Sequence, residues 1–187
     1  YKSAIVSIES AYGHNDPRLI EPLRSFAKTR IRQRTSVRAA TPLLERVLGI
    51  IAKQSEVDPL DHIRAWLELG DIHIITGGKQ ARTAYAAAWV LLENLPGETE
   101  ARNSLFTEPK LLYPNRLAPL FLERRPGAAS PDEDEFYADI SYVVSEAGKV
   151  EKIDIHDRNV PNSQIKILKS LLMGSRFRPR LVAGEPE

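Results

Sequence analysis

The sequence predicts an α+β protein, in which helical hairpins form the N-terminal part and a small strand-strand-helix-strand domain follows. Two observations lead to this prediction. In the first half, apolar residues recur in steps of three and four, and the whole pattern repeats after 42 residues. In the last third, apolar and polar residues alternate, as they do along a half-buried strand. We therefore expect two domains, at residues 1–108 and 109–187.

The repeat is clearest at a pair of Asp-Pro dipeptides. Asp16-Pro17 recurs 42 residues later as Asp58-Pro59. Aspartate is a favoured N-cap and proline a favoured first residue of a helix, so each dipeptide predicts a helix start. In the same register Tyr1 is equivalent to Leu43. This predicts that the chain begins inside the second helix of an earlier unit and that another repeat precedes it in the full protein.

Each unit carries two stripes of apolar residues at helical spacing, which predicts a pair of amphipathic helices with one buried face each. The stripes of the first unit are Leu19, Leu23, Phe26, Ala27 and Ile31, followed by Val37, Ala40, Leu44, Val47, Leu48 and Ile51. Those of the second unit are Leu60, Ile63, Leu67, Gly70 and Ile74, followed by Ala81, Ala84, Tyr85, Ala88, Leu91, Leu92 and Leu95. Val47 and Trp89 are equivalent in this register, so both are expected to be buried.

The second unit also carries a recognisable set of spaced residues, namely Trp66, Leu69, Gly70, Gly77, Ala81, Tyr85 and Ala88. This set resembles the tetratricopeptide repeat, and the long period resembles repeats of the kinesin-light-chain sort. The resemblance covers about residues 1–95. It implies a solenoid of helical hairpins that binds other proteins.

Four elements are expected in the C-terminal domain, after a proline-rich stretch and an acidic run at residues 132–135. They are a strand from Phe136, a second strand at Val150–His156, a helix at Ser163–Met173 and a third strand at Arg176–Val182. A hairpin turn with Gly148 joins the first two strands. In the third strand, alternation places Phe177 and Leu181 inward and the three arginines Arg176, Arg178 and Arg180 outward.

The segments Gly148-Lys149-Val150, Arg176-Phe177-Arg178-Pro179 and Leu181–Pro186 resemble the C-terminal domain of TonB-family proteins, with Leu112-Tyr113-Pro114 as a short lead-in. The resemblance covers about residues 109–187. It implies a periplasmic, non-enzymatic relative of energy transducers that binds extended peptides along a sheet edge. The three arginines of the last strand are then candidate partner-binding residues. The alternative is a charged edge that prevents aggregation and binds nothing.

A second set of candidates lies in the first unit. Residues 24–46 carry seven basic side chains against Glu45 alone, a net charge of +6: Arg24, Lys28, Arg30, Arg32, Arg34, Arg38 and Arg46. We take Arg24, Lys28, Arg30 and Arg34 as candidate partner-binding residues for an acidic peptide or anionic surface. The alternative is a solvated helix face without a partner.

Little in the sequence supports catalysis or a cofactor. The chain has no Cys, which excludes disulfides, cysteine-ligated metals and thiol nucleophiles. His62 and His73 lie about 16 Å apart on one predicted helix, too far to share a metal ion. The net charge of +1 gives no general reason to expect nucleic acid or a membrane surface as partner. The sequence therefore predicts a protein-interaction module. The alternative is a soluble scaffold in which the C-terminal domain only caps the repeats.

Overall fold

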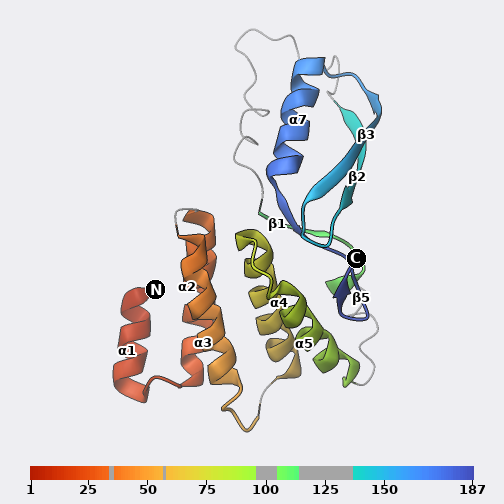
Figure 1. Ribbon diagram of the computed structural model, residues 1–187. Helices are drawn as coiled ribbons and strands as arrows, with labels where there is room; N and C mark the ends of the chain where they lie inside the picture. Colours follow the sequence, from red (N-terminus) through yellow and green to blue (C-terminus); the bar gives the residue numbers. More distant parts are fainter. Residues whose placement is uncertain (34–35, 57, 96–104, 114–136) are drawn as a thin grey trace. The chain divides into compact units, whose positions relative to one another are not determined.

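The structure is a computed structural model that describes residues 1–33, 36–56, 58–95, 105–113 and 137–187. It is an α+β protein with small antiparallel sheets, as predicted (Figure 1). The chain divides into two compact units. The first contains residues 1–108 and 181–186, and the second contains residues 109–180 and 187. The C-terminal segment Leu181–Pro186 thus belongs to the helical unit, whereas the sequence had placed it in the second domain.

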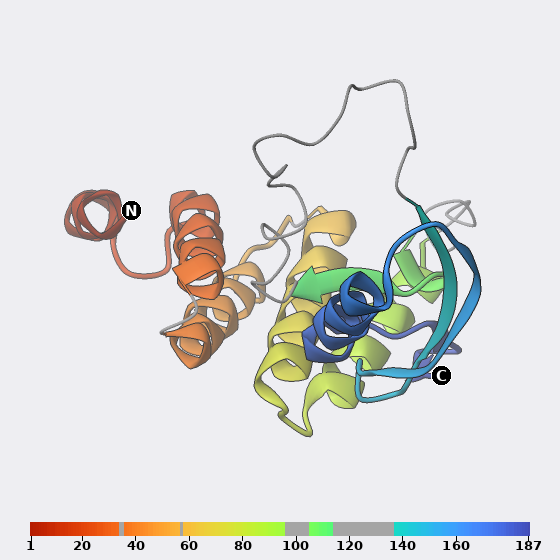
Figure 2. The ribbon, with the colours of Figure 1, turned by 90° about the horizontal axis from the view of Figure 1, so that it is seen from above.

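The first unit consists of helices that follow one another in pairs, with short 3₁₀ turns leading into two of them (Figures 1 and 2). Its elements are α1 (Lys2–Tyr12), η1 (Pro17–Leu19), α2 (Ile20–Gln33), η2 (Val37–Ala40), α3 (Thr41–Ile51), α4 (Pro59–Thr76), α5 (Ala81–Glu93) and the hairpin β5 (Leu181–Val182) and β6 (Glu185–Pro186). Helices α2 and α3 pack together, α3 packs on α4, and α4 packs on α5.

Both predicted helix starts are confirmed. The side chain of Asp16 accepts a hydrogen bond from the backbone N–H of Arg18, and that of Asp58 accepts one from Leu60, each at 2.9 Å. The first start differs from the prediction in one respect, because η1 precedes α2. A similar 3₁₀ turn, η2, precedes α3. Pro42 lies in the first turn of α3 and has no N–H to extend a helix from the preceding residues, so α3 begins only at Thr41.

The predicted apolar stripes form the core of this unit. Residues from all four stripes are buried, including Leu23, Val47, Ile63 and Leu92. Trp89 is only half-buried, so the prediction that it is buried like Val47 is wrong. Ala88, which lies 41 residues after Val47, is fully buried instead.

The crossing of α4 and α5 depends on one glycine. A Cβ atom on Gly70 would lie 2.3 Å from the ring atom Cε1 of Tyr85. The Tyr85 ring is fully buried, and its hydroxyl donates to the carboxylate of Asp71 at 3.0 Å. The missing side chain of Gly70 therefore lets the ring lie directly against the α4 backbone.

The second unit holds a strand hairpin, one helix and a separate pair of short strands. Its elements are β1 (Lys110–Tyr113), β2 (Ala138–Val144), β3 (Val150–Arg158), α7 (Asn162–Gly174) and β4 (Arg176–Arg178). β2 and β3 form the predicted antiparallel hairpin, and Gly148 has the positive φ that its turn requires. α7 packs on β3. The core of this unit includes Val144, Val150 and Phe177.

The predicted third strand is wrong in length and in pairing. β4 ends at Arg178, and β5 begins only at Leu181 and pairs with β6. Pro179 lies at the break, where it can donate no hydrogen bond to a ladder. β4 pairs antiparallel with β1, which lies in the segment that the sequence had indicated only as a lead-in. Each sheet formed by the described residues has two strands.

Candidate interaction surfaces

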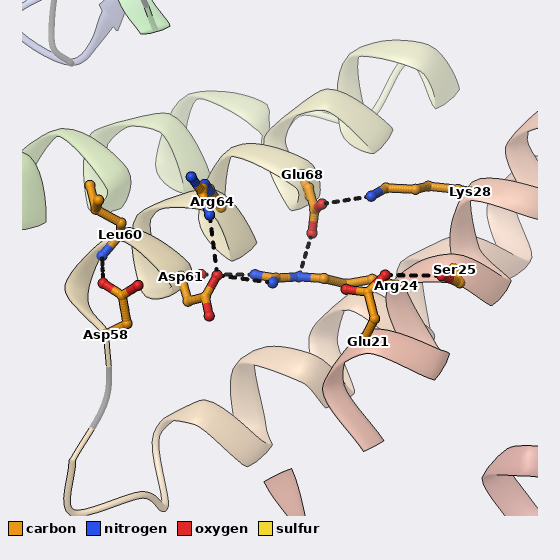
Figure 3. Close-up of polar contacts among 9 residues, drawn as sticks. All are labelled: Glu21, Arg24, Ser25, Lys28, Asp58, Leu60, Asp61, Arg64 and Glu68. Carbon is orange, nitrogen blue, oxygen red and sulfur yellow. Dashed lines mark hydrogen bonds and ion pairs between the residues drawn. The ribbon is translucent and has the colours of Figure 1, made fainter. Parts of the chain in front are cut away.

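Arg24 stands out among the basic residues of α2 because its guanidinium is buried, with 6% of the residue exposed. It reaches from α2 to α4, as Figure 3 shows. Nη1 lies 3.3 Å from the Asp61 carboxylate, and Nη2 donates to the backbone carbonyl of Asp61 at 2.9 Å. Nε lies 3.0 Å from Oε2 of Glu68. Arg24 therefore joins two successive hairpins and is neutralised by them. The sequence predicted Arg24 as a partner-binding residue on an exposed basic surface, and the burial of its guanidinium corrects that prediction.

Glu68 is the least solvated acid of this cluster. Burial raises the pKa of Glu68 above its ordinary value, and the nearby charges of Arg24 and Lys28 act in the opposite direction. Asp61 is more exposed and also lies 3.6 Å from Arg64. The arrangement is a small charge network between hairpins, of the kind in which loss of one member leaves another partly buried charge without its partner.

The remaining candidates on α2 differ in exposure and contacts. The Lys28 side chain is 60% exposed, and its Nζ lies 3.8 Å from Glu68. The guanidinium of Arg30 lies 4.8 Å from the ring centroid of Phe26, a distance at which a cation–π attraction operates. Arg32 is exposed. Arg34 lies outside the described residues. Lys28 and Arg30 thus keep accessible charge, in contrast to Arg24.

Two further basic residues complete the cluster. Arg46 forms an ion pair with Glu9 of α1, and it also donates to the backbone carbonyl of His14 at 2.8 Å. Arg38 is exposed on η2, which packs against α2. We define the basic surface as Lys28, Arg30, Arg32 and Arg38. These four residues come from two elements that pack together, α2 and η2.

The arginines near the C-terminus do not form the predicted outward row. Arg176 is half-buried and donates to the backbone carbonyl of Ser175 at 2.8 Å. Arg178 is buried, with 4% exposed. Arg180 is exposed and forms an ion pair with Glu187. The alternation fails because residues 177–179 are all buried, which a regular two-residue period does not allow.

The expected open edge at this strand is also different. β4 pairs with β1 along one side, with Leu111 opposite Phe177. The backbone N–H of Phe177 donates to the carbonyl of Gly148 at 2.9 Å. β4 therefore has a ladder partner on one side and one further main-chain hydrogen bond, from Phe177. Peptide addition along residues 176–182 stays a prediction.

Sequence reasoning missed the acids that neutralise Arg24. Asp61 and Glu68 are 37 and 44 residues away from Arg24 in the chain, so local spacing gives no signal of the pairing. The 42-residue repeat was the available clue, because it places α2 and α4 at equivalent positions of successive hairpins. It does not say which charges face each other.

The histidines take part in structural contacts. The indole N–H of Trp66 donates to Nε2 of His62 at 3.2 Å, so that nitrogen must be unprotonated. Burial lowers the pKa of His62, which favours the neutral ring. His156 lies 2.7 Å from the hydroxyl of Ser141. Among the described residues, no group of three or more potential ligands could hold a metal ion.

None of the helices in the described ranges has the length and apolar character needed to cross a membrane. No protein-family model, curated protein or solved structure matches this chain.

Proposed function

We propose that the chain is a non-enzymatic protein-interaction module, in which the helical unit binds an acidic segment of a partner protein through the basic surface. The single observation that carries this proposal is the arrangement of charge around α2. The charge of Arg24 is neutralised by ion pairs with Asp61 and Glu68, whereas Lys28, Arg32 and Arg38 are exposed at the surface. Exposed cations on two packed elements attract acidic partners over several ångströms and orient them on approach.

The resemblances support the same class of function. The helical unit resembles tetratricopeptide repeats, and the close contact of Gly70 with Tyr85 gives a physical reason for two of the residues that carry the likeness. The second unit resembles TonB C-terminal domains in its hairpin, helix and following short strand. On these resemblances the protein is periplasmic, and its partners are proteins or extended peptides.

One observation favours the alternative of a scaffold whose C-terminal part caps the repeats. The segment Leu181–Pro186 packs with the helical unit and not with the unit that precedes it in the chain. In that alternative, the second unit has no transport role. The two functions differ in whether binding depends on the basic surface.

The experiment measures binding of a fluorescein-labelled deca-glutamate peptide by fluorescence anisotropy. The double variant Lys28→Glu and Arg32→Glu reverses two exposed charges of the basic surface and should lose most of the affinity. The matched control is Lys79→Glu with Lys166→Glu, which makes the same change in net charge at two exposed positions elsewhere. Equal loss of binding in both variants would show a nonspecific charge effect and would contradict the proposed surface.

A further inference from the structure

Arg24, Lys28 and Arg32 follow one another on α2 at intervals of four residues, so their side chains lie along one stripe of the helix. The stripe changes from buried to exposed along its length. Arg24 is 6% exposed, the Lys28 side chain is 60% exposed, and Arg32 is exposed. The stripe therefore runs from the charge network between the hairpins to the basic surface, and Lys28 belongs to both.

The carboxylate of Glu68 lies at the boundary between the network and the basic surface. Its Oε2 atom is 3.0 Å from Nε of Arg24, and its Oε1 atom is 3.8 Å from Nζ of Lys28. Figure 3 shows the carboxylate between these two side chains of α2. A negative charge of the protein itself is therefore paired with a cation that the proposed partner would use.

Arg24 does not depend on Glu68 alone. Its Nη1 atom lies 3.3 Å from Oδ1 of Asp61, and its Nη2 atom donates to the backbone carbonyl of Asp61. A neutral Glu68 would leave these contacts of Arg24 in place. Lys28 differs, because within the described ranges Glu68 is the one acid with which it forms an ion pair. Loss of the Glu68 charge would therefore act mainly on Lys28, at the surface.

Acidification removes the charge of Glu68 earlier than that of an ordinary glutamate. Burial raises its pKa above the usual 4.5, Arg24 and Lys28 lower the pKa, and Asp71 of the same helix raises it. The elements that pack on α4 bring further charged or titratable groups, which are Tyr85 of α5, whose hydroxyl donates to Asp71, Glu45 of α3, which acts on His73, and the exposed Arg38 of η2. As pH falls, Glu68 becomes neutral while the lysine and arginines of the basic surface keep their charge.

We propose that Glu68 is an intramolecular competitor of the acidic partner, because its carboxylate pairs with Lys28 in the free protein and weakens binding, whereas its protonation frees Lys28 and strengthens binding. Two acids that share one cation also repel each other, so a partner carboxylate gains less from Lys28 while Glu68 is charged. By linkage, a bound polyanion must in turn raise the affinity of Glu68 for a proton. This inference rests on the proposed function, since it concerns the regulation of the basic surface.

The first test measures binding of a rhodamine-labelled decamer of cysteic acid to the full chain by fluorescence anisotropy. The sulfonates of this probe stay ionised in acid, so a change of affinity with pH comes from the protein. At neutral pH, Glu68→Gln should bind the decamer about two- to fivefold more tightly than the wild-type chain, as expected for one partly exposed charge pair. The matched control is Asp61→Asn, which removes the same charge but contacts Arg24 and Arg64, neither of which belongs to the basic surface. Its gain in affinity should be smaller.

The second test follows the titration of Glu68 itself. Carbon NMR of the side-chain carboxyl gives its pKa with and without the unlabelled decamer, and the bound decamer should raise this pKa. As pH falls through it, the affinity of the wild-type chain should approach that of Glu68→Gln. The histidines titrate in both proteins, so their effect cancels in the ratio of the two affinities.

Three results would overturn this inference. They are equal affinities of the wild-type chain and Glu68→Gln at neutral pH, an equal gain in Asp61→Asn, and a ratio of affinities that stays constant while Glu68 titrates. The proposed function would still stand if the decamer binds and the double variant Lys28→Glu with Arg32→Glu weakens that binding. Absence of binding to every variant at low salt would overturn both the inference and the proposed function.

Discussion

At the scale of single residues, the fold depends on a few positions where the type of side chain is dictated by a neighbour. Gly70 is required by the Tyr85 ring, and Arg24 is required by the two acids of α4. His62 is required as an acceptor for Trp66. The sequence pattern predicts the helices that carry these residues but not the contacts between their side chains. Each contact gives a separate prediction.

Gly70→Ala should destabilise the protein although alanine is the better helix former. The new methyl group would overlap the buried Tyr85 ring, and overpacking of this kind costs about 1–3 kcal/mol. The matched control is Gly49→Ala in α3, where an added Cβ meets no atom within 4 Å. That variant should be more stable by up to about 1 kcal/mol. Urea unfolding measures both, and equal effects of the same sign would refute the close contact.

Arg24→Met should be much more costly than Lys28→Met. Removal of the buried guanidinium leaves Glu68 charged and partly desolvated, at a cost of about 3 kcal/mol. Lys28 is largely exposed, and its pair should contribute less than about 1 kcal/mol. The double variant Arg24→Met with Glu68→Met should recover part of the loss in thermal unfolding. A double variant less stable than Arg24→Met would contradict the network.

Stability should fall as the solution is acidified below the pKa of an unfolded histidine, about 6.5. Burial lowers the pKa of His62 in the folded protein, so the unfolded state binds more protons and acid favours it. The loss continues until pH passes the lowered pKa of the folded ring. His62→Gln keeps an acceptor but does not titrate, so its urea midpoint should depend less on pH. Some dependence should remain, because burial also lowers the pKa of His73 against the opposing charge of Glu45.

At the scale of elements, periodicity was a sound guide wherever one face of an element is buried. It predicted the helices of both hairpins, the β2–β3 hairpin and α7, because the apolar residues of each recur at the spacing of that element. It failed at residues 176–182, where Phe177, Arg178 and Pro179 are all buried and the chain changes pairing partner at Pro179. Pairing with β1 involves residues more than 60 positions away, which local pattern does not specify.

The candidate partner-binding residues were also predicted only in part. Local charge density identified Lys28 and Arg30 as accessible cations, and the structure places both at or near the surface. It could not separate them from Arg24, because burial of Arg24 is decided by acids on another hairpin. Arg178 was misassigned for a related reason, since the outward face of a strand exists only where the strand is regular.

The pairing of β4 makes a prediction about hydrogen exchange. The Phe177 N–H donates to Gly148 within the chain, so its exchange with deuterium should be slow and should remain slow when an extended peptide is added. The Ala183 amide, at the exposed hairpin turn, provides an internal reference for fast exchange. Rapid exchange at Phe177, or a peptide-dependent shift confined to β4, would support an open edge there instead.

At the scale of the whole molecule, the chain leaves the helical unit after residue 108 and re-enters it at Leu181. The second unit is therefore attached to the first at both of its ends. We propose that the basic surface of the helical unit recognises acidic partners by charge.

The most direct test is the dissociation constant of the deca-glutamate peptide measured from about 0.01 M to 1 M salt, over which the Debye length falls from about 30 Å to about 3 Å. We expect binding at low salt that weakens steadily as salt increases, with a shallower dependence in the Lys28→Glu and Arg32→Glu variant. A dissociation constant that does not change with salt, or no binding at the lowest salt, would contradict this proposal.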